Sequence, residues 1–358
     1  MTLNEQVDSG TRPPLSGMEI DVTRLDAWLG GHIRSYRGPL TVRQFTGGQS
    51  NPTYLLITPE RRYVLRKRPP GQLLASAHAV DREYRVISAL GAHTDVPVPR
   101  THVLCVDESV LGTAFYVMDY VDGRIFRDPA FPDVPRDQRR DYAFAVCDSL
   151  ARLHRVQPDK VGLSDYGKSA GYVARQVSRW SQQYRENPDA GRVEAIEKLI
   201  EWLPANLPAH EEPAAILHGD YRVDNVFFHP SEPRVLAILD WELSALGEAR
   251  ADLAYHLMVY RMPPLALPGL AGADLAQLGL PTEAEYVARY CERVGRTSVP
   301  DLEFYIAFCM FRLAGIFHGI RGRVARGNAV SPHARDYARY VEPIAELAWQ
   351  QAQRAQRS

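Results

Sequence analysis

Cysteine is scarce in this sequence, with four in 358 residues, and no two of them form a Cys-x-x-Cys pair. Cys105, Cys147, Cys291 and Cys309 are widely separated and lie in apolar stretches. This spacing indicates neither a disulfide framework nor a zinc knuckle, and we expect buried, reduced thiols. An excess of charge is missing as well, because the net charge at pH 7 is -1. Without a basic field, we expect no binding to nucleic acid or to an anionic membrane.

Long apolar runs are also missing. The longest, residues 305–320, is interrupted by Arg312 and His318, and we predict that it forms a buried helix rather than a membrane span. The first 14 residues are polar and lack the apolar core of a signal peptide. We therefore expect a cytoplasmic protein.

The order of the predicted elements indicates an α+β fold. Hydrophobic residues make up 45% of the chain and charged residues 24%, which is ordinary for a globular protein large enough for two lobes. Strand patterns dominate as far as residue 121 and helical periodicity dominates after Gly123, and such segregation favours α+β over a doubly wound sheet. We expect a flexible arm at 1–17, an N-terminal lobe at 18–120 and a C-terminal lobe at 121–358.

The most informative residues are His218-Gly219-Asp220, Asn225 and the later Asp240-Trp241-Glu242. The apolar run at 235–239 predicts a buried strand that ends at Asp240. Phosphoryl transfer from Mg-ATP needs a carboxylate to orient the attacking hydroxyl, and an amide and a second carboxylate to hold Mg²⁺. Asp220, Asn225 and Asp240 offer these groups in that order.

Neighbours of these three residues have possible supporting roles. Arg222 could reach the transferred phosphoryl group and stabilise its charge. His218 is expected to brace the loop rather than to bind a metal. Glu242 could contact a second metal or a cation of the cleft. Asp252 is expected first to cap the helix that it opens, and second to brace the catalytic loop.

A glycine-rich turn, with Gly47, Gly48, Ser50 and Asn51, joins the first two predicted strands. Glycine allows backbone N–H groups to approach phosphates closely, and the two polar side chains add donors. The turn matches neither Gly-x-Gly-x-x-Gly nor the Walker motif, and an ordinary hairpin turn is the alternative. We expect it to contact the phosphates of the nucleotide.

A cation on the third strand, Arg66 or Lys67, is expected to grip these phosphates. Because strand neighbours point to opposite faces, only one of the two faces the cleft. The preceding apolar pair favours Arg66, and lysine chemistry favours Lys67. Glu83 lies on the apolar stripe of the helix predicted near residues 76–90, where a carboxylate needs a buried cation. We expect an ion pair between Glu83 and this cation; a partly solvated Glu at the edge of the stripe is the alternative.

The adenine ring is expected to contact residues between the two lobes. An apolar strand at 115–119 leads into a polar exit, and an adenine site needs only backbone groups and apolar walls. We assign this adenine-binding hinge between the lobes to Met118, Asp119 and Val121, by their order along the chain.

With these residues in place, the chain resembles the aminoglycoside phosphotransferase and choline kinase-like family, which has the bilobal protein-kinase-like fold. The resemblance rests on His-Gly-Asp-x-x-x-x-Asn at 218–225, on Ile-x-Asp-Trp-Glu at 238–242, and on the runs at 150–154 and 247–255. It implies that Asp220 is the catalytic Asp, that Asn225 and Asp240 bind Mg²⁺, and that ATP is the co-substrate.

The runs at 64–71, 77–84 and 175–180 resemble the branch that is also found fused to acyl-CoA dehydrogenases. Fused members are linked to phosphorylation of hydroxyacyl-CoA compounds. The segments expected to bind the acceptor, 170–203 and 300–328, are rich in Arg, whereas polycationic aminoglycosides call for an acidic pocket. We therefore expect an anionic or neutral hydroxyl compound as the acceptor, bound by a monomer or a homodimer.

Three other functions compete with this interpretation. A true aminoglycoside phosphotransferase would share every catalytic residue. A catalytically silent nucleotide-binding module would tolerate their loss, and here all three are present. A metallohydrolase using His218, Asp220 and Asp240 would need more His residues at ligand spacing.

Overall fold

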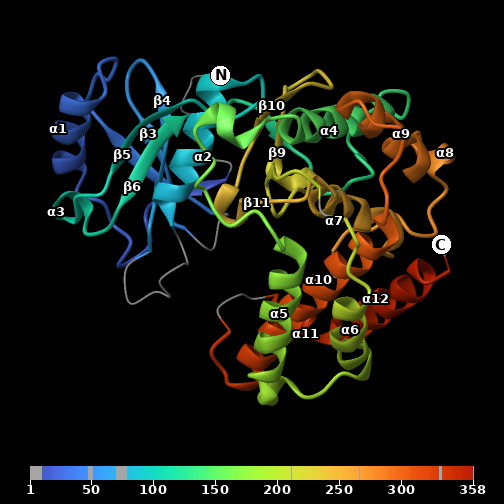
Figure 1. The fold of residues 1–358 in the computed structure, drawn as a ribbon. Helices are drawn as coiled ribbons and strands as arrows, with labels where there is room; N and C mark the ends of the chain where they lie inside the picture. Colours follow the sequence, from blue (N-terminus) through green and yellow to red (C-terminus); the bar gives the residue numbers. More distant parts are fainter. Residues whose placement is uncertain are drawn as a thin grey trace. The chain divides into compact units, whose positions relative to one another are not determined.

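The computed structural model of the chain divides into two compact units (Figure 1). The first comprises Met1–Gly123 together with Leu236–Glu242, and the second comprises Arg124–Val235 and Leu243–Ser358. Residues 236–242, which the sequence placed in the C-terminal lobe, thus pack with the first unit. The described residues are 10–46, 51–69, 79–210, 212–265, 267–329 and 333–357.

The first unit is built on a six-stranded sheet of order β1-β2-β3-β4-β6-β5, in which all paired neighbours are antiparallel. Its strands are β1 (Thr11–Arg12), β2 (Thr41–Phe45), β3 (Thr53–Ile57), β4 (Arg62–Lys67), β5 (Thr101–Cys105) and β6 (Phe115–Asp119). Its helices are α1 (Val22–His32), α2 (Val80–His93) and α3 (Glu108–Leu111). The short segment 236–242 that belongs to this unit contains most of strand β10 (Val235–Ile238) and most of the 3-10 turn η4 (Trp241–Leu243).

The two faces of the sheet are covered by different helices. Successive residues of β4 point to opposite faces. Tyr63 and Leu65 belong to the hydrophobic core that includes Leu25 and Leu29 of α1. Arg66 therefore points to the other face, where α2 contacts β5 and β6. The strand period thus gives one face of the sheet an apolar core and places the cation of β4 on the face of α2.

The predicted flexible arm differs from the structure in its last part. Strand β1 pairs with β2, with Thr11 opposite Phe45 and Arg12 opposite Gln44. The amide of Leu15 also donates to the Gln44 side chain at 2.9 Å. Thr11 and Arg12 therefore extend the edge of the sheet, and Leu15 is tied to β2 through the Gln44 side chain.

The second unit is mainly helical (Figure 1). Its helices are α4 (Arg139–His154), α5 (Tyr172–Arg185), α6 (Glu194–Ala205), α7 (Ala249–Arg261), α8 (Leu275–Leu278), α9 (Glu283–Val294), α10 (Leu302–Ala325), α11 (Ala334–Arg339) and α12 (Val341–Ala355). Its strands are β7 (Arg124–Ile125), β8 (Ala215–Leu217), β9 (Val226–Phe228) and β11 (Ala245–Gly247), and its 3-10 turns are η1 (Pro158–Val161), η2 (Pro188–Ala190) and η3 (Val223–Asn225). The antiparallel pairs β7–β9 and β8–β11 frame the loop that carries the central motif. The predicted α+β organisation is confirmed.

Helix α10 forms the core of the second unit. It contacts α5, α6, α7, α11 and α12, and both Arg312 and His318 are buried. Within the described residues it is the one helix long and apolar enough to cross a membrane, but 78% of its apolar window is buried inside the protein. The prediction of a buried helix is confirmed. The four cysteines are also buried and free, as expected.

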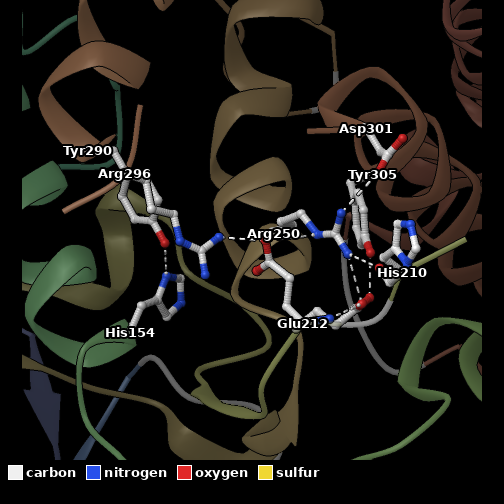
Figure 2. A network of polar contacts seen from close by, with 9 residues as sticks. His154, His210, Glu212, Arg250, Tyr290, Arg296, Asp301 and Tyr305 are labelled. Atoms are coloured by element: carbon white, nitrogen blue, oxygen red, sulfur yellow. Dashed lines mark hydrogen bonds and ion pairs between the residues drawn. The ribbon is translucent and has the colours of Figure 1, made fainter. Parts of the chain in front are cut away.

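A buried arginine secures the segment that precedes β8 (Figure 2). Arg250 of α7 is 2% exposed and lies 2.9 Å from Glu248, 3.0 Å from Asp301 and 3.5 Å from Glu212. Tyr305 of α10 donates a hydrogen bond to the Glu248 carboxylate. Because a buried guanidinium needs several acceptors, this network fixes the chain that enters β8 against α7 and α10.

Candidate active site

The loop between β8 and β9 places the central motif in the second unit. Gly219 has a left-handed backbone, with φ of 82°. A Cβ on this residue would meet the carbonyl oxygen of Leu243 at 2.3 Å. Only glycine satisfies both conditions, and it turns the chain so that Asp220 follows directly.

We expect Gly219→Ala to lower the free energy of unfolding by more than about 2 kcal/mol, because a left-handed conformation and a backbone clash add together. Gly162→Ala is the matched control, since Gly162 has φ of +71° and a Cβ at this position would have nothing within 4 Å. The control should lose only about 1–2 kcal/mol. Urea unfolding of both variants measures the difference, and equal losses would contradict the clash.

Three side chains contact the Asp220 carboxylate. The Tyr255 hydroxyl of α7 donates to Oδ1 at 2.5 Å. Asn225 Nδ2 donates to Oδ2 at 3.1 Å and to the Asp220 carbonyl at 2.8 Å. Arg222 Nε lies 3.6 Å from Oδ1, and its Nη2 donates to Asp224 at 2.9 Å. The carboxylate is thus held in one orientation with its side chain 22% exposed.

Asp252 of α7 holds the loop between β8 and β9 through hydrogen bonds to its backbone. Its carboxylate accepts from the amides of His218 at 2.6 Å and Gly219 at 2.9 Å, and it lies 3.5 Å from Nε2 of His154. Burial raises the pKa of Asp252, but the histidines and amide donors more than offset this and lower the pKa below its ordinary value. The prediction that Asp252 caps its helix is wrong, because α7 begins after Glu248; the bracing role is confirmed.

Arg312 and Tyr255 are the residues that sequence reasoning missed. Arg312 donates to the carbonyl of Gly219 at 2.8 Å, and its guanidinium lies 5.2 Å from the centre of the Tyr255 ring. The available signal was a charge in the otherwise apolar run of α10. For Tyr255 no motif gave such a signal, because its place beside Asp220 depends on how α7 packs.

A cavity of about 280 Å³ opens beside these residues within the second unit. Arg222 and Tyr255, which both contact Asp220, line it together with Arg127 and Asp224. Much of the remaining wall is apolar and includes Met258, Val259, Met262, Leu267 and Leu313. His256 also lines the cavity, and burial lowers its pKa to about 4, so it is neutral at pH 7. The cavity therefore has no excess of negative charge.

In the first unit, Arg66 is the centre of a carboxylate cluster. Its Nε lies 2.7 Å from Glu83, and its Nη2 lies 2.7 Å from Asp240 and 3.5 Å from Glu242. Burial alone would lower the pKa of Arg66, but these carboxylates, Glu83 foremost, raise it above its ordinary value. Arg66 therefore stays charged, and the predicted ion pair with Glu83 is confirmed.

Glu83 is 1% exposed and has further donors beside Arg66. Asn51 Nδ2 donates to Oε1 at 2.7 Å and the Tyr116 hydroxyl to Oε2 at 3.1 Å. Burial raises the pKa of Glu83, and the charge of Arg66 and these hydrogen bonds oppose that shift. Asn51 is thus tied to α2. The other residues assigned to the glycine-rich turn, Gly47, Gly48 and Ser50, lie outside the described residues.

Lys67 points to the opposite face of β4 from Arg66. Burial lowers its pKa, and it makes no ion pair within the part of the chain that the structure describes. The two cations left open by the sequence are therefore in different environments. Only Arg66 contacts Glu83 and Asp240.

Asp240 has a left-handed backbone, with φ of 66°, which is uncommon for a residue with a side chain. Such a conformation persists where the surrounding structure determines it, often at functional sites. Asn225, the other predicted metal ligand, belongs to the second unit. Because Nδ2 of Asn225 donates to Asp220, its Oδ1 remains the oxygen available for a cation. Carboxylate and amide oxygens fit Mg²⁺.

The three residues assigned to the adenine site, Met118, Asp119 and Val121, lie in different environments. Met118 is buried in β6, whereas the Asp119 carboxylate lies 2.7 Å from Nε2 of His102. The Asp119 amide donates to the carbonyl of Arg100 at 2.8 Å. Val121 follows β6 in irregular chain and is partly buried. The Asp119 side chain is thus engaged within its own sheet. Among the described residues, no group of three or more His, Cys, Asp or Glu is arranged to hold a metal.

An antiparallel sheet with one helix on the ion-pair face, followed in the chain by a helical unit that carries the Asp220 loop, defines the protein-kinase-like fold. Choline kinase from Cryptosporidium parvum shares this fold, with a TM-score of 0.59 over 93% of this chain and 96% of that one, at 11% identity. A model of the phosphotransferase enzyme family matches residues 41–286. The chain belongs to this family, which implies phosphotransferase activity with ATP.

Two relatives are more similar. A candidate aminoglycoside phosphotransferase from Ralstonia eutropha is 43% identical, with a TM-score of 0.87 over 94% of this chain and 99% of that one. Acyl-CoA dehydrogenase family member 10 of Mus musculus is 41% identical over 343 residues, which cover 95% of this chain and 32% of that protein. The chain spans about a third to just under half of the length of the curated relatives it matches. The resemblance to the branch named with acyl-CoA dehydrogenases is confirmed.

Proposed function

We propose that the protein transfers the γ-phosphate of Mg-ATP to a hydroxyl group of a small molecule. The observation that carries this proposal is the Asp220 carboxylate, oriented by Tyr255 and Asn225 next to a cavity that Tyr255 and Arg222 line. In the proposed step the acceptor oxygen bonds to the γ-phosphorus, the bond to the bridging oxygen breaks to release ADP, and the hydroxyl proton passes to Asp220.

The other polar residues have supporting roles in this proposal. Mg²⁺, held by Asn225 and Asp240, would neutralise charge on the phosphates. Arg66, kept charged and rigid by Glu83, grips the α- and β-phosphates, and Arg222 stabilises the charge of the transferred group.

The nucleotide would be held by groups of the first unit. The turn with Gly47, Gly48, Ser50 and Asn51 covers its phosphates. The adenine contacts the chain at Met118, Asp119 and Val121. Lys67 stays the weaker candidate for phosphate binding because it shares a face with the hydrophobic core.

The cavity supports an anionic or neutral acceptor. Its charged lining consists of Arg127, Arg222 and Asp224, and Asp224 already pairs with Arg222. A polycationic acceptor would contact two arginines and a carboxylate that is already paired with one of them. It would lose hydration on entering the cavity and gain no favourable ion pair in return. The apolar wall fits an acceptor with an aliphatic part.

The relatives named as acyl-CoA dehydrogenases support an acceptor of the hydroxyacyl-CoA type. Such a compound combines an aliphatic hydroxyl with anionic phosphates, which agrees with the cavity. A second candidate function, aminoglycoside phosphorylation, is favoured by the Ralstonia eutropha relative, which is named a candidate aminoglycoside phosphotransferase.

An acceptor panel tests the proposal. We expect ADP release from Mg-ATP to depend on a hydroxyacyl-CoA or a related hydroxyl compound, with kcat/KM at least about 100-fold above that for any aminoglycoside. The matched control is the same acyl-CoA without the hydroxyl, which should give no ADP above background. Faster turnover of aminoglycosides would contradict the acceptor class. Tight binding of Mg-ATP without turnover of any acceptor would instead favour a catalytically silent module.

A further inference from the structure

Tyr255 links the proposed general base to the wall of the cavity. Its hydroxyl donates to Oδ1 of Asp220 at 2.5 Å, and its side chain lines the cavity. The residue is 5% exposed and is held on α7, three residues after the Asp252 that braces the same loop. No other phenol contacts Asp220 within the described residues.

A carboxylate needs such a partner to keep one orientation. The terminal torsion of Asp is broad and roughly two-fold, so packing alone does not select a rotation about Cβ–Cγ. Asn225 contacts Oδ2 from within the loop, and Tyr255 contacts Oδ1 from the helix behind it. Hydrogen bonds to both oxygens, from different elements, leave the carboxylate one rotation.

We propose that Tyr255 is a positioning residue, whose hydroxyl fixes the rotation of the Asp220 carboxylate and so sets which lone pairs face the acceptor hydroxyl. The inference rests on the proposed function, because it assigns Tyr255 a role only if Asp220 receives the proton. Beyond the proposed function, it makes the orientation of Asp220 depend on Tyr255, a residue that also lines the cavity.

Arg312 supports the same arrangement from the core. It is buried, donates to the carbonyl of Gly219 at 2.8 Å, and faces the Tyr255 ring at 5.2 Å. Among the residues that the structure describes, no carboxylate forms an ion pair with it. A buried cation without a paired anion is costly, and it is best tolerated beside an electron-rich ring and an aligned carbonyl. Arg312 thereby holds both the Tyr255 ring and the backbone that precedes Asp220.

Tyr255 acts as a donor and not as a second base. Burial and the neighbouring Asp220 raise the pKa of Tyr255 above its ordinary value, so the phenol keeps its proton at neutral pH. A protonated phenol at this distance can only donate to Oδ1, which is the role the geometry requires.

The test compares Tyr255→Phe with Tyr305→Phe. Both variants remove a buried hydroxyl that donates to a carboxylate, but Tyr305 donates to Glu248 in the network around Arg250 (Figure 2). We expect Tyr255→Phe to lower kcat about 10- to 100-fold, because a misoriented base loses its alignment with the acceptor. KM for ATP should stay within about twofold. Tyr305→Phe should lower the thermal midpoint but leave kcat within about twofold.

A double variant separates positioning from a general structural effect. If Tyr255 acts through Asp220, then adding Tyr255→Phe to Asp220→Asn should change the residual rate by less than about twofold. An unchanged kcat in Tyr255→Phe, or an equal kcat loss in Tyr305→Phe, would overturn the inference. So would a loss in the Asp220→Asn background as large as in the wild type. Wild-type turnover by Asp220→Asn alone would instead overturn the proposed function itself.

Discussion

Replacing Asp220 by Asn should lower kcat by about 10²- to 10⁴-fold while the affinity for Mg-ATP stays within about twofold. The side chain keeps its size, but it can no longer accept the hydroxyl proton of the acceptor. Arg66 and the other residues of the first unit that we propose to bind the nucleotide are unchanged in this variant. Single-turnover kinetics measure the chemical step, and calorimetry with a non-hydrolysable ATP analogue measures binding.

Asp148→Asn is the matched control for this variant. Asp148 lies on α4 of the same unit, its side chain is 23% exposed against 22% for Asp220, and it also contacts arginine, at 2.8 Å from Arg289. The same loss of charge at this position should leave kcat within about twofold. If both variants lost activity equally, the effect would reflect a general change in charge or stability, and the assignment of Asp220 would be wrong.

Replacing Arg66 by Met should have the second large effect, on stability and on nucleotide binding together. Glu83 is 1% exposed and would be left in the core without its cation. Removing one partner of a buried ion pair costs about 3–5 kcal/mol. The affinity for Mg-ATP should also fall, by at least about 10-fold, because the cation that we propose to bind the phosphates is lost. Urea unfolding and calorimetry give the two values.

A second substitution separates these two effects. Arg66→Met combined with Glu83→Gln removes both charges, so most of the lost stability should return. Binding of Mg-ATP should stay weak, because no cation is restored. Arg62→Met, on the same strand, is the control: Arg62 pairs with the exposed Asp122 at 3.3 Å, and such surface pairs contribute about 0–1 kcal/mol. Recovery of ATP affinity in the double variant would contradict the role of Arg66.

The periodicity of the sequence was sufficient to predict an ion pair between Glu83 and one of two neighbouring cations of β4. Glu83 lies on the apolar stripe of its helix, and a carboxylate there requires a cation close by. The alternation of β4 restricts that cation to one of two neighbours. What periodicity did not decide was which face of β4 meets α2, because that depends on the register of β4 against β3 and β6. Arg66 lies opposite Thr53 and Tyr116 in this register.

The partners of Asp220 were less predictable. Asn225 was singled out by its spacing as a metal ligand, but its hydrogen bond to the Asp220 carboxylate was not predicted. Tyr255 and Arg312 come from helices 35 and 92 positions later in the chain, and no local pattern marks them as neighbours of the loop. Asp252 looked like a helix cap, whereas α7 begins earlier and turns its carboxylate toward the amides of His218 and Gly219.

The sequence by itself determined the segregation of strands and helices, the buried character of α10, the family and the polar groups that the proposed phosphoryl transfer would use. These follow from local period, spacing and residue chemistry, which are properties of short segments. The tertiary structure alone decided that Arg66 rather than Lys67 meets Glu83, that Asp252 braces the loop, and that Tyr255 and Arg312 stand behind Asp220. Those contacts join elements far apart in the chain, and their formation depends on helix packing and strand register, which no short segment encodes.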